Sequence, residues 1–219
     1  MRAFAISDIH GHLEHFDQLL TLIELSKSDK LFLLGDYIDR GKKSKGVLDR
    51  IIELQTDGYN IKCIRGNHEQ MLLDAFQNDV LLNFWLRNGG QQTLESFGIS
   101  QIEDLPELYL NFIHELPHFI EFENYILVHA GINMLAESPL EDLESMLWLR
   151  GWEKKFERNW IGDRVVIHGH TPQPEKFLKS RANKGRVIGI DNGVYFNQSE
   201  FGGLCAFELL SKEIKIFKK

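Results

Sequence analysis

The chain has 219 residues, of which 43% are hydrophobic and 26% are charged, and its formal net charge at pH 7 is −7. This composition is ordinary for a globular protein with one sizeable core, and the negative charge argues against a nucleic-acid-binding surface. No apolar run approaches the length of a membrane span.

The first third of the chain alternates between short apolar runs and amphipathic segments. Buried strands are predicted at 3–6, 31–34 and 61–64. Helices with apolar residues on one face are predicted at 13–25, 47–54 and 69–76. Strands that alternate with helices in this way are typical of parallel β-α-β units, with the helices packed on the sheet.

The middle of the chain, residues 79–115, has a helical pattern throughout. Within it, the Asn-Gly-Gly of WLRNGG at 85–90 is predicted to stop a helix. A hairpin is predicted from the two apolar runs at 119–122 and 125–128. Further strands are predicted at 165–167, 187–190, 203–208 and 214–217.

Polar clusters follow several of these strands. DIHG follows the first strand, GDYIDRG the second and RGNHE the third, and two later strands run into HAG and HGHT. In open α/β sheets the ligand site lies at the carboxyl ends of the strands. We therefore expect these clusters to converge in space although they are far apart in the sequence.

The side chains in the clusters are those of a transition-metal site. Five strand ends deliver His, Asp or Asn, and mixed oxygen and imidazole ligands suit Mn, Fe or Zn but not Ca. There are too many of them for one ion, so we favour a dinuclear centre with one carboxylate bridging ions roughly 3.5–4 Å apart. A single strand-end Asp is usually a cap or turn residue, but independent capping does not explain all of the clusters in order.

Some histidines are set apart from this centre. In HGHT only one of His168 and His170 need bind metal. The others lie on the first predicted helix or belong to no cluster, and we read them as structural: His12, His15, His114 and His118.

The motifs DIHGH, GDYIDRG and RGNHE resemble the three signature motifs of the phosphoprotein phosphatase family of metallophosphoesterases. Later stretches are similar, in order and spacing, to the small bacterial and phage-type serine/threonine phosphatases of that family: WLRNGG, LVHAG, LWLRG, HGHTP and IDNGVYFNQSEFGGLCAFEL. The match covers nearly the whole chain. It implies a calcineurin-like metallophosphoesterase fold of the α/β class, in part α+β, with a mixed β-sandwich flanked by helices.

The resemblance also implies a role for each site residue. The metal ligands would be Asp8, His10, Asp36, Asn67, His129 and His170, with Asp36 bridging two divalent ions. We expect Mn²⁺, with Fe and Zn as alternatives. The bridging hydroxide that such ions generate would attack phosphorus directly. His68 and Asp39 would form the catalytic acid dyad, and the phosphate would be bound by Arg40, Arg150 and Asn67. The alternative for Asp39 and Arg40 is a local surface ion pair.

The activity implied is hydrolysis of phosphoserine and phosphothreonine, with phosphotyrosine as a further candidate. The expected partners are phosphoproteins or phosphopeptides, with no nucleic acid and no membrane; the oligomeric state stays open. One alternative is a symmetrical diadenosine tetraphosphate hydrolase or a hydrolase of another small phosphate ester. Glu69 favours the protein phosphatases, because the dinucleotide hydrolases tend to have Asp there. A non-catalytic metal-binding scaffold is disfavoured, since no ligand or dyad residue is missing.

One residue departs from the pattern of the family, and another has two possible roles. Gly131 stands where the phage-type enzymes can have an acidic residue. Asp191 reads equally well as a residue behind the metal ligands and as part of a turn-forming Asp-Asn-Gly.

Three features bear on organisation and location. No Pro/Gly/Ser-rich linker is present, so we expect one domain over residues 1–219. The two cysteines, Cys63 and Cys205, form no paired motif, which suits a reducing compartment. The N-terminal stretch is interrupted by charge too soon for a signal peptide. We therefore expect a cytoplasmic protein.

Overall fold

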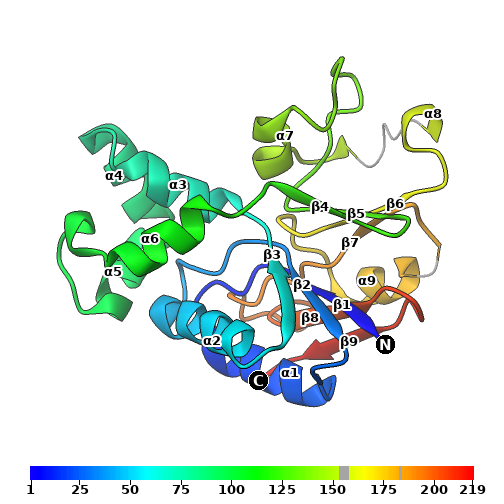
Figure 1. The fold of residues 1–219 in the computed structure, drawn as a ribbon, viewed down its shortest axis with the longest axis horizontal. Helices are drawn as coiled ribbons and strands as arrows, with labels where there is room; N and C mark the ends of the chain where they lie inside the picture. The colour runs from blue at the N-terminus through cyan, green and yellow to red at the C-terminus, as the bar shows by residue number, and fades with distance from the viewer. Residues whose placement is uncertain (153–157, 183) are drawn as a thin grey trace.

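Two β-sheets lie face to face, with helices outside them (Figure 1). This computed structural model describes residues 1–152, 158–182 and 184–219. The first sheet has the order β3 (Asn60–Cys63), β2 (Lys30–Leu33), β1 (Ala3–Ile6), β8 (Leu204–Glu208) and β9 (Ile214–Phe217). The second has the order β4 (Phe119–Phe122), β5 (Tyr125–Val128), β6 (Val165–His168) and β7 (Val187–Gly189). The mixed β-sandwich implied by the family resemblance is confirmed.

The helices fall into three groups along the chain. The first sheet is covered on its outer face by α1 (Leu13–Leu22) and α2 (Ser44–Thr56). A helical insert follows, with α3 (Asn67–Ala75), α4 (Asp79–Trp85), a π-helical turn (Leu86–Gly90), α5 (Gln91–Phe97), a 3₁₀ turn (Ile102–Asp104) and α6 (Glu107–His114). The second half carries α7 (Leu143–Trp148), α8 (Arg158–Ile161) and α9 (Glu175–Arg181). No helix among the described residues combines the length and the apolar character needed to cross a bilayer.

Alternation along the strands builds three layers of core. In β1, Phe4 and Ile6 pack with α1 and α2, whereas Ala3 and Ala5 face the second sheet. In β5, Leu127 faces back toward the first sheet, and its neighbours on either side pack outward with α7. Successive side chains of a strand point to opposite faces, so a buried strand with both faces covered is apolar throughout. The short apolar runs of the sequence are therefore strands that are buried on both faces.

The elements predicted for the first third of the chain are confirmed, with ends that differ by at most three residues. The hairpin is confirmed as the antiparallel pair β4–β5, and the later strands as β6 to β9. The predicted stop in WLRNGG is confirmed as a kink: Gly89 has φ +112 within the π-helical turn, after which the chain continues as α5.

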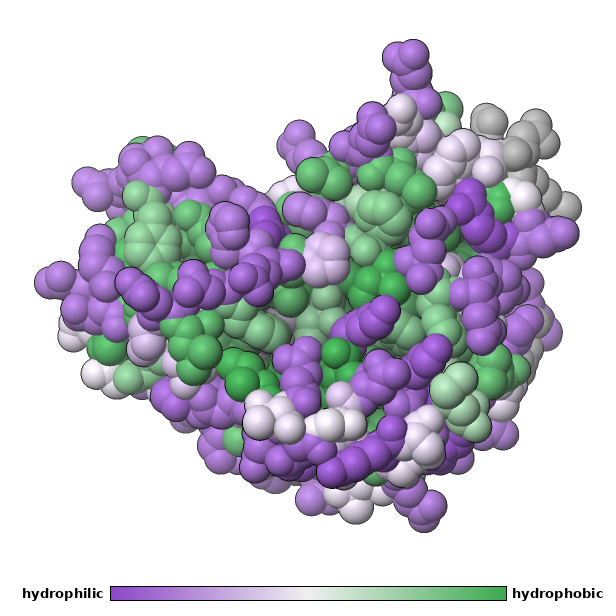
Figure 2. Space-filling view, in the orientation of Figure 1, coloured by the Kyte–Doolittle hydropathy of each residue, from purple (hydrophilic) through white to green (hydrophobic). Residues whose placement is uncertain are grey.

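Parallel pairing brings the strand ends to one edge. Ile6 pairs with Leu33, and Leu33 pairs with Cys63, so the segments that follow β1, β2 and β3 start side by side. Val128 of β5 pairs with His168 of β6 in the same manner. On the face shown in Figure 2, the surface is hollowed between the helical insert and α7. The helices α4 and α7 both carry exposed apolar side chains, Val80 and Phe84 on α4 and Leu143 and Trp148 on α7.

Candidate metal centre

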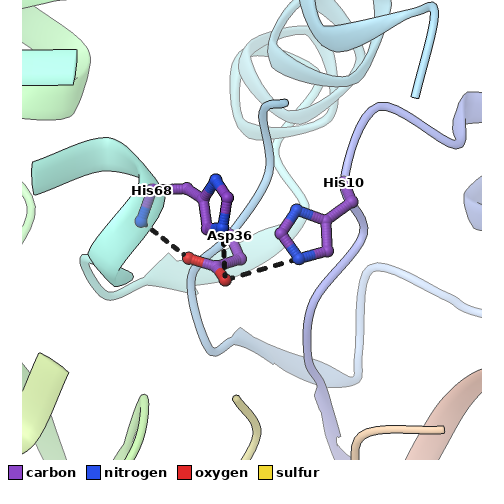
Figure 3. A group of neighbouring side chains, drawn as sticks. All are labelled: His10, Asp36 and His68. Atoms are coloured by element: carbon purple, nitrogen blue, oxygen red, sulfur yellow. Dashed lines mark hydrogen bonds and ion pairs between the residues drawn. The ribbon is translucent and has the colours of Figure 1, made fainter. Parts of the chain in front are cut away.

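Asp36 stands at the middle of two groups of buried side chains. Its Oδ2 lies 3.4 Å from Nε2 of His10 and 4.0 Å from Nε2 of His68 (Figure 3). Its Oδ1 lies 3.5 Å from Nε2 of His129. In each group, His10–Asp36–His68 and Asp36–His129–His170, the possible ligand atoms lie within 4.8 Å of one another. One carboxylate is therefore placed to serve two cations.

His129 has the geometry of a metal ligand. Its Nδ1 lies 2.8 Å from the carbonyl oxygen of Leu34, which can only accept, so Nδ1 carries the proton. Its Nε2 then presents a lone pair, and the side-chain oxygen of Asn67 faces that atom at 3.0 Å. Two lone-pair atoms at this distance repel unless a proton or another cation lies between them. Burial lowers the pKa of His129 to about 4, which disfavours the proton at neutral pH.

His10 is oriented in the same way. Its Nδ1 lies 3.0 Å from the carbonyl oxygen of Ile38, which leaves Nε2 as an acceptor. Arg40 donates to Nε2 at 2.8 Å, and its guanidinium lies 4.1 Å above the ring of Tyr195. The side of Asp36 next to His10 therefore already faces a positive charge supplied by the protein itself.

Asp8 and Asp191 complete the acidic lining. Both carboxylate oxygens of Asp8 accept from the backbone N–H of His170, at 3.1 and 3.0 Å, and each keeps a further lone pair. Asp8 lies outside the two groups built on Asp36. Oδ1 of Asp191 accepts from the backbone N–H of Gly193 at 2.6 Å, which supports the turn reading of Asp-Asn-Gly. Asp191 is nevertheless buried, and the charge of Asp8 is close enough to raise the pKa of Asp191.

The electrostatics of these groups suit a cation. Burial, and then the charge of Asp8, raises the pKa of Asp36 and of Asp191 well above the usual range. Burial lowers the pKa of His10 and His170 well below the usual range, so these imidazoles are neutral near pH 7. Neutral imidazole is the form that binds metal, and a nearby cation would offset the repulsion among the carboxylates.

The backbone around the centre is strained. Residues without a glycine's freedom adopt positive φ, between 46° and 70°, at Asp8, His10, Asp36, Asp39, Arg40 and His170. Each such residue costs about 1–3 kcal/mol, and residues of this kind cluster at functional sites. All six were singled out from the sequence as site residues.

His170 supplies a direct test of whether the site fits a metal. Among the described residues, its Nε2 is buried and has no hydrogen-bond partner, although most buried polar atoms in proteins have one. In the part of the chain that the structure describes, His170 belongs to a group that could hold a metal ion, whereas His168, two positions earlier, does not. Together with the facing lone pairs of Asn67 and His129, this atom fits a site built for divalent ions.

His68 and Asp39 form a buried pair. Nδ1 of His68 lies 2.7 Å from Oδ2 of Asp39, and the two side chains are 1% and 0% exposed. Burial raises the pKa of Asp39 to about 8, and hydrogen bonds from Thr93 and Trp85 act in the opposite direction. The alternative of a surface ion pair between Asp39 and Arg40 is wrong, because Asp39 is fully enclosed.

Arg150 reaches the centre from the segment after α7. Its guanidinium lies 3.4 Å from the hydroxyl of Thr171, the residue after His170. Its charge lowers the pKa of both His129 and His170, after the larger effect of burial. Trp148, which is 38% exposed, lies edge-on to His170 at 6.4 Å between ring centroids.

Glu69 joins two of the loops that carry site residues. Its carboxylate is fully buried and accepts from the backbone N–H groups of Asp36 at 2.7 Å, Tyr37 at 2.8 Å and Gly66 at 3.0 Å. It ties the loop after β2 to the start of α3. The length of the side chain at this position therefore sets the spacing of the two loops, and the preference for protein phosphatases that the sequence drew from Glu69 stays a prediction.

Gly131 is explained by a close neighbour. A Cβ at this position would lie 2.3 Å from Nε1 of Trp152, which donates to the carbonyl oxygen of Ala130. The indole occupies the space that a side chain at 131 would need, and His168 packs against the same indole at 5.6 Å.

Comparison with known proteins places this arrangement in a family. The model of the calcineurin-like phosphoesterase family matches residues 1–204. The serine/threonine-protein phosphatase 2 of Escherichia coli (strain K12) is 34% identical over 153 residues, which make up 66% of this chain and 66% of that protein. The symmetrical bis(5'-nucleosyl)-tetraphosphatase of Pseudomonas putida (strain W619) is 28% identical over 218 residues, 97% of this chain and 69% of that protein. The chain thus spans about two thirds of the length of these relatives.

Solved structures share the fold. A serine/threonine phosphatase from Saccharomyces cerevisiae has a TM-score of 0.69 at 16% identity, over 100% of this chain and 80% of that one. A metallophosphoesterase from Sphaerobacter thermophilus has a TM-score of 0.62 at 16% identity, over 100% of this chain and 88% of that one. At these identities the likeness concerns the fold alone.

Proposed function

The chain belongs to the calcineurin-like phosphoesterase family and is a metallophosphoesterase, and on that premise we propose that it hydrolyses phosphoserine and phosphothreonine in proteins. Phosphotyrosine is a further candidate. The observation that carries this proposal is the buried His68–Asp39 pair beside Asp36.

The leaving group explains why this pair matters. Serine and threonine leave as alkoxides, which are strong bases and need a proton as the ester bond breaks. His68 is the proposed donor, because its Nε2 points toward the centre while its Nδ1 is held by Asp39. A nucleoside diphosphate, by contrast, is a weak base and leaves without such help.

The remaining residues divide the work around the phosphoryl group. Asp8, His10 and Asp36 would hold one divalent ion, and the other would be held by Asp36, Asn67, His129 and His170. Such ions, when bound, lower the pKa of water and so supply a nucleophile near neutral pH. Arg40 and Arg150 would bind the phosphoryl oxygens with their forked guanidinium groups, and Asn67 would assist. His10 would bind an ion through Nε2 only after Nη1 of Arg40, which now donates to that atom, has moved away. The other N–H groups of the guanidinium can meet phosphoryl oxygens.

A second candidate is symmetrical hydrolysis of diadenosine tetraphosphate. It is favoured by relatives of that name that match nearly the whole length of this chain. Both candidates use the same phosphoryl chemistry, so the geometry of the metal-binding groups does not discriminate between them.

Turnover on the two substrate classes is the deciding measurement. One Mn²⁺-loaded preparation is assayed on phosphoserine, phosphothreonine and phosphotyrosine peptides and on diadenosine tetraphosphate. We expect the highest kcat/KM on a phosphoserine or phosphothreonine peptide. A higher kcat/KM on the tetraphosphate, with ADP as the product, would establish the second candidate instead.

Replacing either arginine should weaken binding of the phosphoryl group. A hydrogen bond to a charged group contributes about 1.5–3 kcal/mol, so Arg40→Ala and Arg150→Ala should each lower kcat/KM roughly 10- to 100-fold. The loss should be equal for a phosphopeptide and for p-nitrophenyl phosphate, because both present the same oxygens. Inhibition by vanadate should weaken in parallel.

The matched control for the arginines is Arg50→Ala. Arg50 lies on α2 and pairs with Asp17 and Glu53, away from the centre. This variant should keep the kinetics of the parent protein. If Arg150→Ala kept full kcat/KM and normal vanadate inhibition, its assignment to the phosphate would be wrong.

A further inference from the structure

The segment of residues 85–93, which contains WLRNGG, contacts the buried side chain of Asp39. Nε1 of Trp85 donates to its carboxylate, at 3.0 Å from Oδ2 and 3.2 Å from Oδ1. The hydroxyl of Thr93 donates to Oδ1 at 2.6 Å. Trp85 and Thr93 are both fully buried. Together with Nδ1 of His68, these donors surround the carboxylate and fix its orientation.

Thr93 also holds the backbone of the same residue. Its oxygen lies 3.0 Å from the backbone N–H of Asp39, and the hydroxyl of Ser44 lies 3.0 Å from both groups. A hydroxyl has one proton to donate and two lone pairs that accept. Because Thr93 donates its proton to Oδ1 of Asp39, its oxygen is free to accept from the backbone N–H of Asp39. One side chain thus binds both the carboxylate and the backbone of Asp39.

Gly89 acts on the next residue, Arg40. Its carbonyl oxygen accepts from the backbone N–H of Arg40 at 3.2 Å. A Cβ on Gly89 would lie 2.5 Å from that nitrogen, and one on Gly90 would lie 2.4 Å from the ring of Trp85. The two glycines thus permit the π-helical turn to approach both the arginine and the tryptophan. This close approach accounts for the two glycines of the Asn-Gly-Gly sequence in a region that is otherwise helical.

The contacts fall on a pair of residues that needs support. Asp39 and Arg40 are consecutive, neither is glycine, and their φ values are +70° and +67°. Such a conformation persists only where the surroundings determine it more strongly than the residue's own preference. The 85–93 segment supplies hydrogen bonds to the backbone N–H of each residue of the pair.

We propose that the 85–93 segment is a positioning device for the reaction: Trp85 and Thr93 hold Asp39 against His68, and Gly89 aims Arg40. The proposal rests on the roles assigned above to His68 and Arg40. It gives the helical insert a part in the chemistry itself, in addition to any part in forming the walls around the centre.

The two halves of the proposal predict different kinetic signatures. Displacing Asp39 misaligns the proton donor, which matters most for basic leaving groups. Displacing Arg40 weakens the hold on the phosphoryl oxygens, which are the same in every substrate. A series of aryl phosphates with leaving groups of increasing basicity therefore separates the two effects, whatever the natural substrate.

In this series, Thr93→Val should lose about 10- to 100-fold in kcat for the most basic leaving group, part of the 10²–10⁴-fold that a general acid supplies. It should lose little for p-nitrophenyl phosphate, with KM and metal content unchanged. Thr93→Ser, which keeps the hydroxyl, should restore most of the rate. Gly89→Ala should lower kcat/KM equally across the series and weaken inhibition by vanadate.

Trp85→Phe gives a second test of the hold on Asp39. It keeps the buried ring, removes the N–H donor and should show the leaving-group dependence of Thr93→Val, so it decides the matter if Thr93→Val does not fold. The matched control is Thr56→Val, at an exposed hydroxyl on α2 that donates to the carbonyl oxygen of Ile52 in the same helix.

A loss that is uniform across leaving groups in both Thr93→Val and Trp85→Phe, accompanied by a lower Tm, would overturn the proposal and leave the segment a purely structural role. Failure of the parent protein to hydrolyse any member of the series would instead count against the proposed phosphomonoesterase function.

Discussion

Removing divalent ions with a chelator is expected to abolish hydrolysis, and adding Mn²⁺ is expected to restore it with two ions bound per chain. The reason is the shared position of Asp36, whose two oxygens face separate groups of histidines. Asp36→Asn should therefore lose both ions, whereas His170→Asn should lose one. Elemental analysis of the purified variants, together with their rates, checks this expectation.

Stability gives an independent readout of the same ions. A ligand that binds only the folded state at 100 times its Kd stabilises that state by about 2.7 kcal/mol per site, so saturating Mn²⁺ should raise the Tm. His114→Asn is the control, because His114 is exposed at the end of α6 and lies outside both groups. A single bound ion in fully active protein would contradict the dinuclear centre.

Replacing His68 is expected to slow turnover by a factor on the order of 10²–10⁴, the usual range for a general acid. His68→Asn removes the proposed proton donor while Asp36 keeps its other neighbours. The loss should be large for phosphoserine peptides and much smaller for p-nitrophenyl phosphate, whose leaving group departs with little protonation. Steady-state kinetics on the two substrates measure the difference.

Metal content decides how the His68 result is read. Nε2 of His68 lies 4.0 Å from Oδ2 of Asp36 and also belongs to a possible metal-binding group. If His68→Asn retains both ions, His68 acts through its proton. If an ion is lost with it, His68 is a ligand. His15→Asn, on α1, is the matched control and should change neither the rate nor the ion count.

Much of the fold follows from local pattern. The strand–helix alternation of the first third predicted β1 to β3 and α1 to α3, because these segments have a clear apolar period and polar ends. The short helices α7 and α9 were not predicted, since six or seven residues carry too little periodicity. The division of the strands into two sheets depends on pairings such as β1 with β8, which join residues about 200 positions apart. Only the family resemblance indicated it.

The candidate site also has a part that the sequence predicts and a part that it does not. Asp8, His10, Asp36, His68, His129 and His170 could be gathered from the sequence, because parallel strands bring their carboxyl ends to one edge. The other partners of Asp39 besides His68 could not, since Trp85 and Thr93 lie some fifty residues away on the insert and meet it only through tertiary packing. The one signal was WLRNGG itself. The contacts of Glu69 with backbone N–H groups were likewise not predicted, because the sequence alone does not show which amides its carboxylate reaches.

The buried carboxylate of Glu69 has a consequence for how such an enzyme can diversify. It joins the loop that carries Asp36 to the helix that begins with Asn67 and His68, so these residues keep their mutual spacing as one module. Of the two helices beside the hollow, α4 packs on α3 and ends at Trp85, which bonds to Asp39. α7 lies in another part of the chain, so an exposed side chain on it such as Leu143 can change without altering the hydrogen bonds of Glu69. A centre held in this way can keep its geometry while the surface around it varies, and the relatives of this chain do carry two different names, serine/threonine-protein phosphatase 2 and symmetrical bis(5'-nucleosyl)-tetraphosphatase.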